Sequence, residues 1–112
     1  MIEANVLYEQ GLIRSFTLSG HAESGPYGHD LVCAAVSAVA FGSVNAVLAL
    51  ADFDLSIDQG KDGGFLSITL EGSLTGTSEE KAQLLLAGMV VSLETIERDY
   101  AKFLCIRKKE GG

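Results

Sequence analysis

The stretch Leu31–Ala51, LVCAAVSAVAFGSVNAVLALA, decides the fold because it runs for 21 residues without a charged side chain. Its length alone would allow a membrane-spanning helix. The composition argues against a span, since the stretch is rich in alanine, has four Leu or Phe residues, and contains Ser37, Ser43 and Asn45. Asp30 and Asp52 bracket it without a Lys or Arg anchor near either end. We therefore expect a helix buried on all sides in a soluble protein, with no membrane association.

Alternating segments on both sides of this helix predict strands. Apolar and polar residues alternate with a period of two at residues 2–8, 12–19, 53–58, 65–71 and 102–108. Turn residues at 9–11 and 61–64 predict two hairpins. In the second strand, we expect Leu12, Phe16 and Leu18 to share one apolar face.

A second helix is predicted between the fourth and fifth strands. Ser78, followed by Glu79 and Glu80, is typical of a helix start, and the helix should run to about Tyr100. The order is then ββαββαβ, and each strand has one apolar face, as in antiparallel sheets with one solvated side. We expect one α+β domain over residues 1–112, with its two helices packed between or under antiparallel sheet layers.

Charge and cysteine content narrow the class of function. The 112-residue chain has a net charge of −7 and a pI of about 4.6, which argues against direct nucleic-acid binding and favours a basic partner. The N-terminal residues lack the basic region of a signal peptide, so we expect a cytoplasmic protein. In that reducing compartment, Cys33 and Cys105 should not form a disulfide, and Cys105 is interpreted as structural.

Cys33 is the candidate nucleophile. If Asp30 caps the helix, Cys33 is the third helical residue and its backbone N–H is unpaired within the helix. The helix dipole would then favour a thiolate, and the N–H groups at the helix start could hold an oxyanion. The pattern is equally compatible with a small cysteine packed in an apolar helix.

Several neighbouring residues could assist such a thiol. His21, at the end of a strand, is the first candidate for the general base, and His29 is the rival, although a residue before the cap should point away from the first turn. Asp30 could orient an imidazole, and Ser37 lies one turn after Cys33. Each also has an ordinary structural interpretation, as a surface histidine, a cap or a packing residue. Gly25, Pro26 and Gly28 make residues 21–30 suitable for a loop that closes on substrate, but these residues are equally typical of an ordinary turn.

Metal binding is the alternative for the same segment. His21, His29, Asp30 and Cys33 are ligand types for zinc, but their spacing matches no common zinc pattern. We expect neither a metal nor an organic cofactor.

Two short runs resemble a known family signature. They are Ser19-Gly20-His21-Ala22 and Gly28-His29-Asp30-Leu31-Val32-Cys33-Ala34-Ala35-Val36-Ser37. This combination resembles the Prp family, the ribosomal-processing cysteine proteases of Firmicutes and their relatives, and the resemblance covers the whole chain. It implies Cys33 as nucleophile and His21 as base. It also implies a substrate loop that includes Gly20, Gly25, Gly28 and His29. Asp30 and Ser37 match the motif, which leaves the third catalytic member open.

The resemblance also implies a substrate and an assembly state. Members of the family are similar to endopeptidases that remove an N-terminal extension from the twenty-seventh large-subunit ribosomal protein, a step needed for ribosome assembly or function. The cut lies between a pair of aromatic residues and an alanine. A homodimer and a flexible loop at residues 21–30 are implied as well. The alternative is a non-catalytic, ribosome-associated peptide-binding module in which Cys33 is merely packed.

Overall fold

The computed structural model describes residues 1–20, 26–60 and 65–111, with the backbone alone at residues 26–30. The elements follow the predicted order. They are β1 (Ile2–Glu9), β2 (Leu12–Gly20), α1 (Pro26–Ala46), a π-helical turn η1 (Val47–Ala51), β3 (Ser56–Asp58), β4 (Phe65–Thr69), α2 (Thr77–Asp99) and β5 (Leu104–Glu110). The α+β class and the ββαββαβ order are therefore confirmed. The predicted third strand is shorter than expected, because its first three residues lie outside β3.

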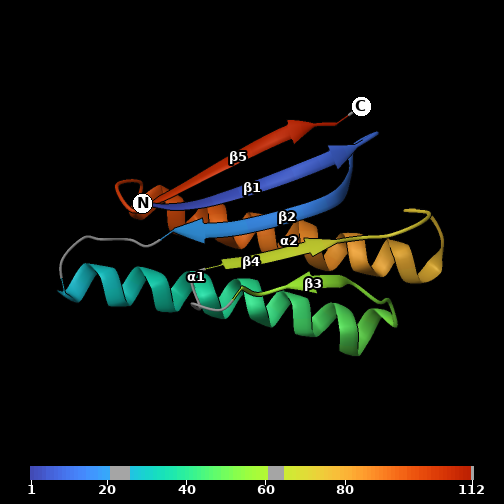
Figure 1. The fold of residues 1–112 in the computed structure, drawn as a ribbon, viewed down its shortest axis with the longest axis horizontal. Helices are drawn as coiled ribbons and strands as arrows, with labels where there is room; N and C mark the ends of the chain where they lie inside the picture. Colours follow the sequence, from blue (N-terminus) through green and yellow to red (C-terminus); the bar gives the residue numbers. More distant parts are fainter. Residues whose placement is uncertain (21–25, 61–64, 112) are drawn as a thin grey trace.

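One mixed sheet replaces the predicted antiparallel layers. The strand order is β3-β4-β2-β1-β5, and β1 pairs in parallel with β5 while the other neighbours are antiparallel (Figure 1). The parallel pair is possible because the chain crosses back through α2, which supplies the long connection that parallel strands need. The helices consequently lie under a single sheet and not between two.

The core lies between the helices and one face of this sheet. Side chains that alternate along the strands are buried there, among them Ile2, Ala4 and Val6 of β1 and Leu66 and Ile68 of β4. Burial of apolar surface of this kind is the main favourable term in folding. The other sheet face is more open and carries polar side chains such as Asn5.

Helix α1 is buried on one side only, which corrects the expectation of burial all round. Its buried residues recur every three or four positions: Val32, Val36, Ala40, Val44 and, in η1, Val47. The stretch Leu31–Ala51 still meets the length and composition criterion for a membrane span, and 28% of its most apolar window is buried. The single sheet covers one side of the helix, whereas the prediction required a second layer (Figure 1).

A β-bulge in β2 changes which side chains reach the core. Leu7 pairs with Ser15 and Tyr8 pairs with Ile13, so Arg14 is an extra residue without a partner in β1. Ile13 is therefore buried together with Phe16, although they are three positions apart. The prediction that Leu12 shares the buried face is wrong for this reason, and Leu12 is only half-buried.

Candidate active site

Cys33 lies well inside α1 and not at its start. The helix begins at Pro26, which makes Cys33 its eighth residue. Proline suits the first helical position, since its fixed φ is helical and its missing N–H would have no partner there. The prediction that Asp30 caps the helix is therefore wrong, because Asp30 is the fifth helical residue.

The earlier helix start removes two predicted roles from the helix terminus. Free backbone N–H groups belong to the first turn, at about residues 27–29, and the N–H of Cys33 lies beyond them. The dipole effect also falls off within the first turn. The helix terminus therefore supplies neither the thiolate stabilisation nor the oxyanion donor that we predicted at Cys33.

The helix brings the backbones of other candidates close to Cys33. Gly28, His29 and Asp30 lie in α1, so the expectation that residues 21–30 form one loop is wrong for these three positions. Positions 29, 33 and 37 follow each other by one turn, and position 30 is also one turn before Cys33. The argument that His29 must point away from the first turn therefore no longer holds. Ser37 is exposed, whereas Cys33 is half-buried and packs against the hydrophobic core.

Strand β2, after which we predicted the general base His21, ends at Gly20. His21 and Gly25 lie outside the described residues, so the site is known up to Gly20 on one side and from Pro26 on the other. Gly20 has φ +90°, a conformation that other residues rarely adopt. A side chain there would overlap the backbone carbonyl of Met1, which lies against it. Gly20 therefore fixes the direction in which the chain leaves β2 towards residue 21.

Cys105 occupies a different environment. It lies in β5, is half-buried, and does not form a disulfide with Cys33. Its register partner in β1 is Glu3, whose carboxylate contacts Arg107 at 2.5 Å. Within the described part of the chain, no three His, Cys, Asp or Glu side chains gather as a group that could hold a metal.

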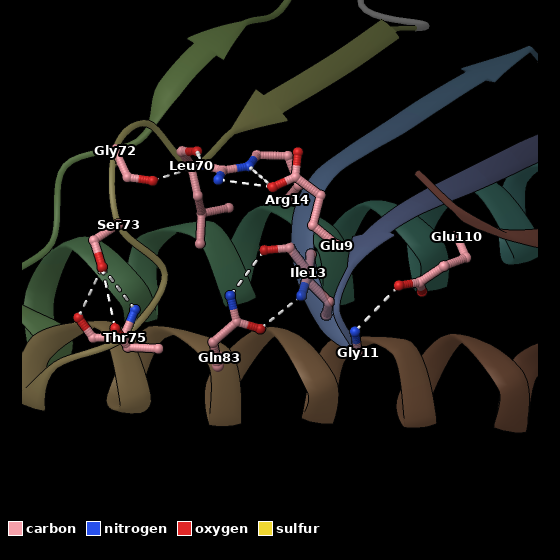
Figure 2. A network of polar contacts seen from close by, with 10 residues as sticks. All are labelled: Glu9, Gly11, Ile13, Arg14, Leu70, Gly72, Ser73, Thr75, Gln83 and Glu110. Carbon is pink, nitrogen blue, oxygen red and sulfur yellow. Dashed lines mark hydrogen bonds and ion pairs between the residues drawn. The ribbon is translucent and has the colours of Figure 1, made fainter. Parts of the chain in front are cut away.

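A polar network at the opposite end of β2 was not predicted. Arg14, placed by the bulge, donates to the carbonyls of Leu70 and Gly72 and pairs with Glu9 at 2.8 Å (Figure 2). These bonds tie the first hairpin to the segment after β4, and they border a cavity of about 460 Å³. The only sequence signal was the break in alternation at Ile13 and Arg14. This network is a structural clamp between the sheet and the chain that leads to α2.

The amide of Gln83 joins α2 to the same strand. It accepts from the N–H of Ile13 and donates to its carbonyl, both at 2.8 Å (Figure 2). Both backbone groups at the bulge are thereby satisfied by one side chain.

Comparison with known proteins identifies the protein class. The sequence profile of the cysteine protease Prp family matches residues 1–105. The chain belongs to the Prp family of cysteine proteases. The "ribosomal processing cysteine protease Prp" of Bacillus subtilis (strain 168) is 50% identical over 102 residues, which cover 89% of this chain and 90% of the relative. Family membership makes this chain a cysteine protease. The alternative of a non-catalytic peptide-binding module is therefore wrong.

Solved Prp structures share the fold. The S. aureus ribosomal processing protease Prp with a covalently linked product peptide has a TM-score of 0.86 and 38% identity, covering 97% of this chain and all of that one. The same protease with a substrate peptide has a TM-score of 0.84 and 37% identity, at the same coverage. The mixed sheet and two helices are therefore the Prp fold.

Proposed function

We propose that Cys33 is the nucleophile of this Prp protease and that His21 is its general base. The positions of the two cysteines in the described structure support the choice of Cys33. Cys33 lies in α1, and only the five residues 21–25, His21 among them, separate this helix from the end of β2, whereas Cys105 lies in β5. Residues 21–25 connect Gly20 to Pro26 in the sequence, so the proposed base and the proposed nucleophile belong to neighbouring segments of the chain.

The proposed reaction is acyl transfer to a thiol followed by hydrolysis. His21 removes the proton from Cys33, and the thiolate attacks the scissile carbonyl carbon. The C–N bond breaks when the imidazolium of His21 protonates the leaving amine, which leaves a thioester on Cys33. His21 then takes a proton from water as the water oxygen attacks the thioester carbon. The C–S bond breaks, the acid is released, and the imidazolium returns its proton to the Cys33 thiolate. No metal or organic cofactor takes part in these steps.

Asp30 and Ser37 are proposed to support this pair. Both positions lie one turn from Cys33 along α1. Asp30 would orient the imidazole. Because Asp30 does not cap the helix, its carboxylate is not needed for that role. The exposed hydroxyl of Ser37 would donate a hydrogen bond near the thiol or to the oxyanion.

The proposed substrate is a ribosomal protein precursor. The relative in B. subtilis is named a ribosomal processing cysteine protease, and at 50% identity we expect the same class of substrate here. We assign the N-terminal extension of the twenty-seventh large-subunit ribosomal protein, cut between a pair of aromatic residues and an alanine. Ribosomal proteins are basic because they bind RNA, which suits an enzyme of net charge −7. Gly20, Gly25, Gly28 and His29 would border the bound peptide, and the enzyme would act in the cytoplasm as a homodimer.

Cleavage of a synthetic precursor peptide tests this proposal. The peptide spans the extension and the cut site, and mass spectrometry reads the products of the wild type, Cys33→Ala and Cys105→Ala. We expect the wild type and Cys105→Ala to cut before the alanine and Cys33→Ala to leave the peptide intact. Alanine is the best helix former, so Cys33→Ala should keep the fold. Cleavage by Cys33→Ala at the wild-type rate would refute the assignment of the nucleophile.

A further inference from the structure

Strand β3 forms an edge of the sheet, and its outer side has no strand neighbour. It is the last strand in the sheet order and pairs with β4 alone (Figure 1). In the part of the chain that the structure describes, the backbone of residues 53–58 makes no hydrogen bond outside this pairing. The outward N–H and C=O groups of β3 can therefore pair with another extended chain.

The opposite edge of the sheet, β5, is partly covered by side chains of α2. Glu97 accepts a hydrogen bond from the backbone N–H of Ile106 at 2.8 Å, and Lys108 pairs with Glu94 at 3.0 Å. Both glutamates belong to α2, so this helix occupies part of the β5 edge. Addition of a strand is therefore favoured at β3 and not at β5.

The segment around β3 has the pattern of a longer strand than the sheet contains. Apolar and polar residues alternate over residues 53–58, and burial follows the same alternation. Phe53 and Leu55 pack against the core, whereas Asp54 between them is exposed. Only the last three residues of the segment pair with β4. A chain along the outer side would give the first three the strand partner that β4 does not supply.

The charge along this edge indicates which kind of chain fits. Asp52, Asp54 and Asp58 are exposed, and residues 52–60 contain no Lys or Arg. A second copy of β3 would place these carboxylates opposite each other, which is unfavourable. A strand that carries Lys or Arg would instead place opposite charges across the pair. The edge therefore fits an extended basic peptide.

The edge also leads towards the end of the sheet that precedes the proposed base. Strands β2 and β3 are both antiparallel to β4, so they run in the same direction. Ser67 of β4 pairs with Asp58 of β3 on one side and with Thr17 of β2 on the other. The Asp58 end of β3 therefore lies at the end of the sheet where β2 finishes at Gly20, directly before His21.

We infer that the outer edge of β3 is a docking site for the segment of the ribosomal protein precursor that follows the cut. This inference rests on the proposed function and adds a second contact with the substrate, outside the catalytic pair. The segment belongs to the mature ribosomal protein, whose basic side chains suit Asp54 and Asp58. It would bind as a strand added to β3, with affinity from its backbone hydrogen bonds and selectivity from its cations.

Cleavage of two precursor peptides of different length tests the docking site. The short peptide ends soon after the cut, and the long peptide continues into the lysine-rich segment that follows. We expect the wild type to have a KM about tenfold lower for the long peptide, and Asp54→Lys to abolish this difference. Asp99→Lys is the matched control, because it changes the net charge equally at an exposed position of α2, and it should preserve the difference. Circular dichroism confirms that each variant is folded.

Backbone methylation of the long peptide tests strand pairing separately from charge. Alternate N–H groups of an edge strand point to its neighbour, so N-methylation of every second residue after the cut removes either all of the donors to β3 or none. We expect one alternating set to raise the KM to that of the short peptide and the other set to change it little. Equal effects of the two sets would contradict pairing with β3.

Contrary outcomes are distinct for the docking site and for the protease. Equal KM values for the short and long peptides, or a difference that Asp54→Lys retains, would overturn the docking site and leave the nucleophile assignment standing. Failure to cut either peptide would refute the proposed function. Fluorescence anisotropy of the labelled downstream segment then tests docking without cleavage. Binding to the wild type and Asp99→Lys but not to Asp54→Lys would support the docking site, and equal or absent binding would overturn it.

Discussion

At the scale of single residues, steric surroundings separate positions that have similar backbone angles. Gly11 and Gly20 have φ values of +80° and +90°. A side chain at Gly11 would meet nothing within 4 Å, whereas one at Gly20 would overlap the carbonyl of Met1. Gly20 is thus required by packing as well as by conformation, and it directly precedes the proposed base.

Replacing Gly20 with alanine should therefore cost more than the same change at Gly11. We expect Gly20→Ala to lower the free energy of unfolding by about 2–4 kcal/mol, because it adds an overlap to the strain of a positive φ. Gly11→Ala should cost about 1–2 kcal/mol. Urea unfolding of both variants measures the difference. Equal losses would show that the Met1 contact has no part in the requirement.

The assignment of the base is also a residue-scale prediction. His21→Ala should lower kcat on the precursor peptide by about 10²–10⁴-fold, the usual contribution of a general base. His29→Ala should change kcat far less and act mainly on KM, if His29 only borders the substrate. Steady-state kinetics of the two variants decides between them. The reverse order of effects would make His29 the base, a position one turn from Cys33 in α1.

At the scale of elements, the sequence predicts what is periodic and misses what interrupts a period. The strands were predictable because β-strands alternate with a period of two. The bulge at Arg14 was not, because one extra residue shifts burial from Leu12 to Ile13 without a composition change. The start of α1 was misplaced because Asp30 and Pro26 are both helix-start signals, and proline is the one that the helix uses.

The bond between α2 and the bulge gives an element-scale prediction. Gln83→Ala should lower the free energy of unfolding by about 1–3 kcal/mol, because the N–H and carbonyl of Ile13 both lose their partner. Ser92→Ala, an exposed change on the same helix, is the control and should be nearly neutral. Chemical denaturation measures both. A Gln83→Ala protein as stable as the control would mean that water replaces the amide at no cost.

At the scale of the whole molecule, the number of sheet layers could not be predicted from the sequence. An uncharged helix predicted cover on several sides, and one mixed sheet supplies cover on one. The remaining side of the helix is exposed. The site was predictable in its residue types and spacing, but the position of His21 relative to Cys33 depends on residues 21–25, outside the described part of the chain.

Net charge gives a prediction for the whole molecule. With a charge of −7, the enzyme should attract a basic precursor at a distance, and salt should screen that attraction. We expect KM for a lysine-rich precursor peptide to rise about threefold or more between roughly 0.05 and 0.5 M salt, with kcat unchanged. A peptide with glutamine in place of the lysines should show little salt dependence. An equal salt response of the two peptides would argue against electrostatic attraction of the substrate.

The central claim is that Cys33 is the nucleophile. The most direct test is to identify the thiol that attacks the substrate carbonyl. A precursor peptide ending in a chloromethyl ketone at the scissile position would alkylate the nucleophile, and mass spectrometry of a digest would locate the adduct. We predict one adduct, on Cys33, and its loss in the presence of excess uncut peptide. An adduct on Cys105, or none on either thiol in an enzyme that still cuts the parent peptide, would contradict the mechanism.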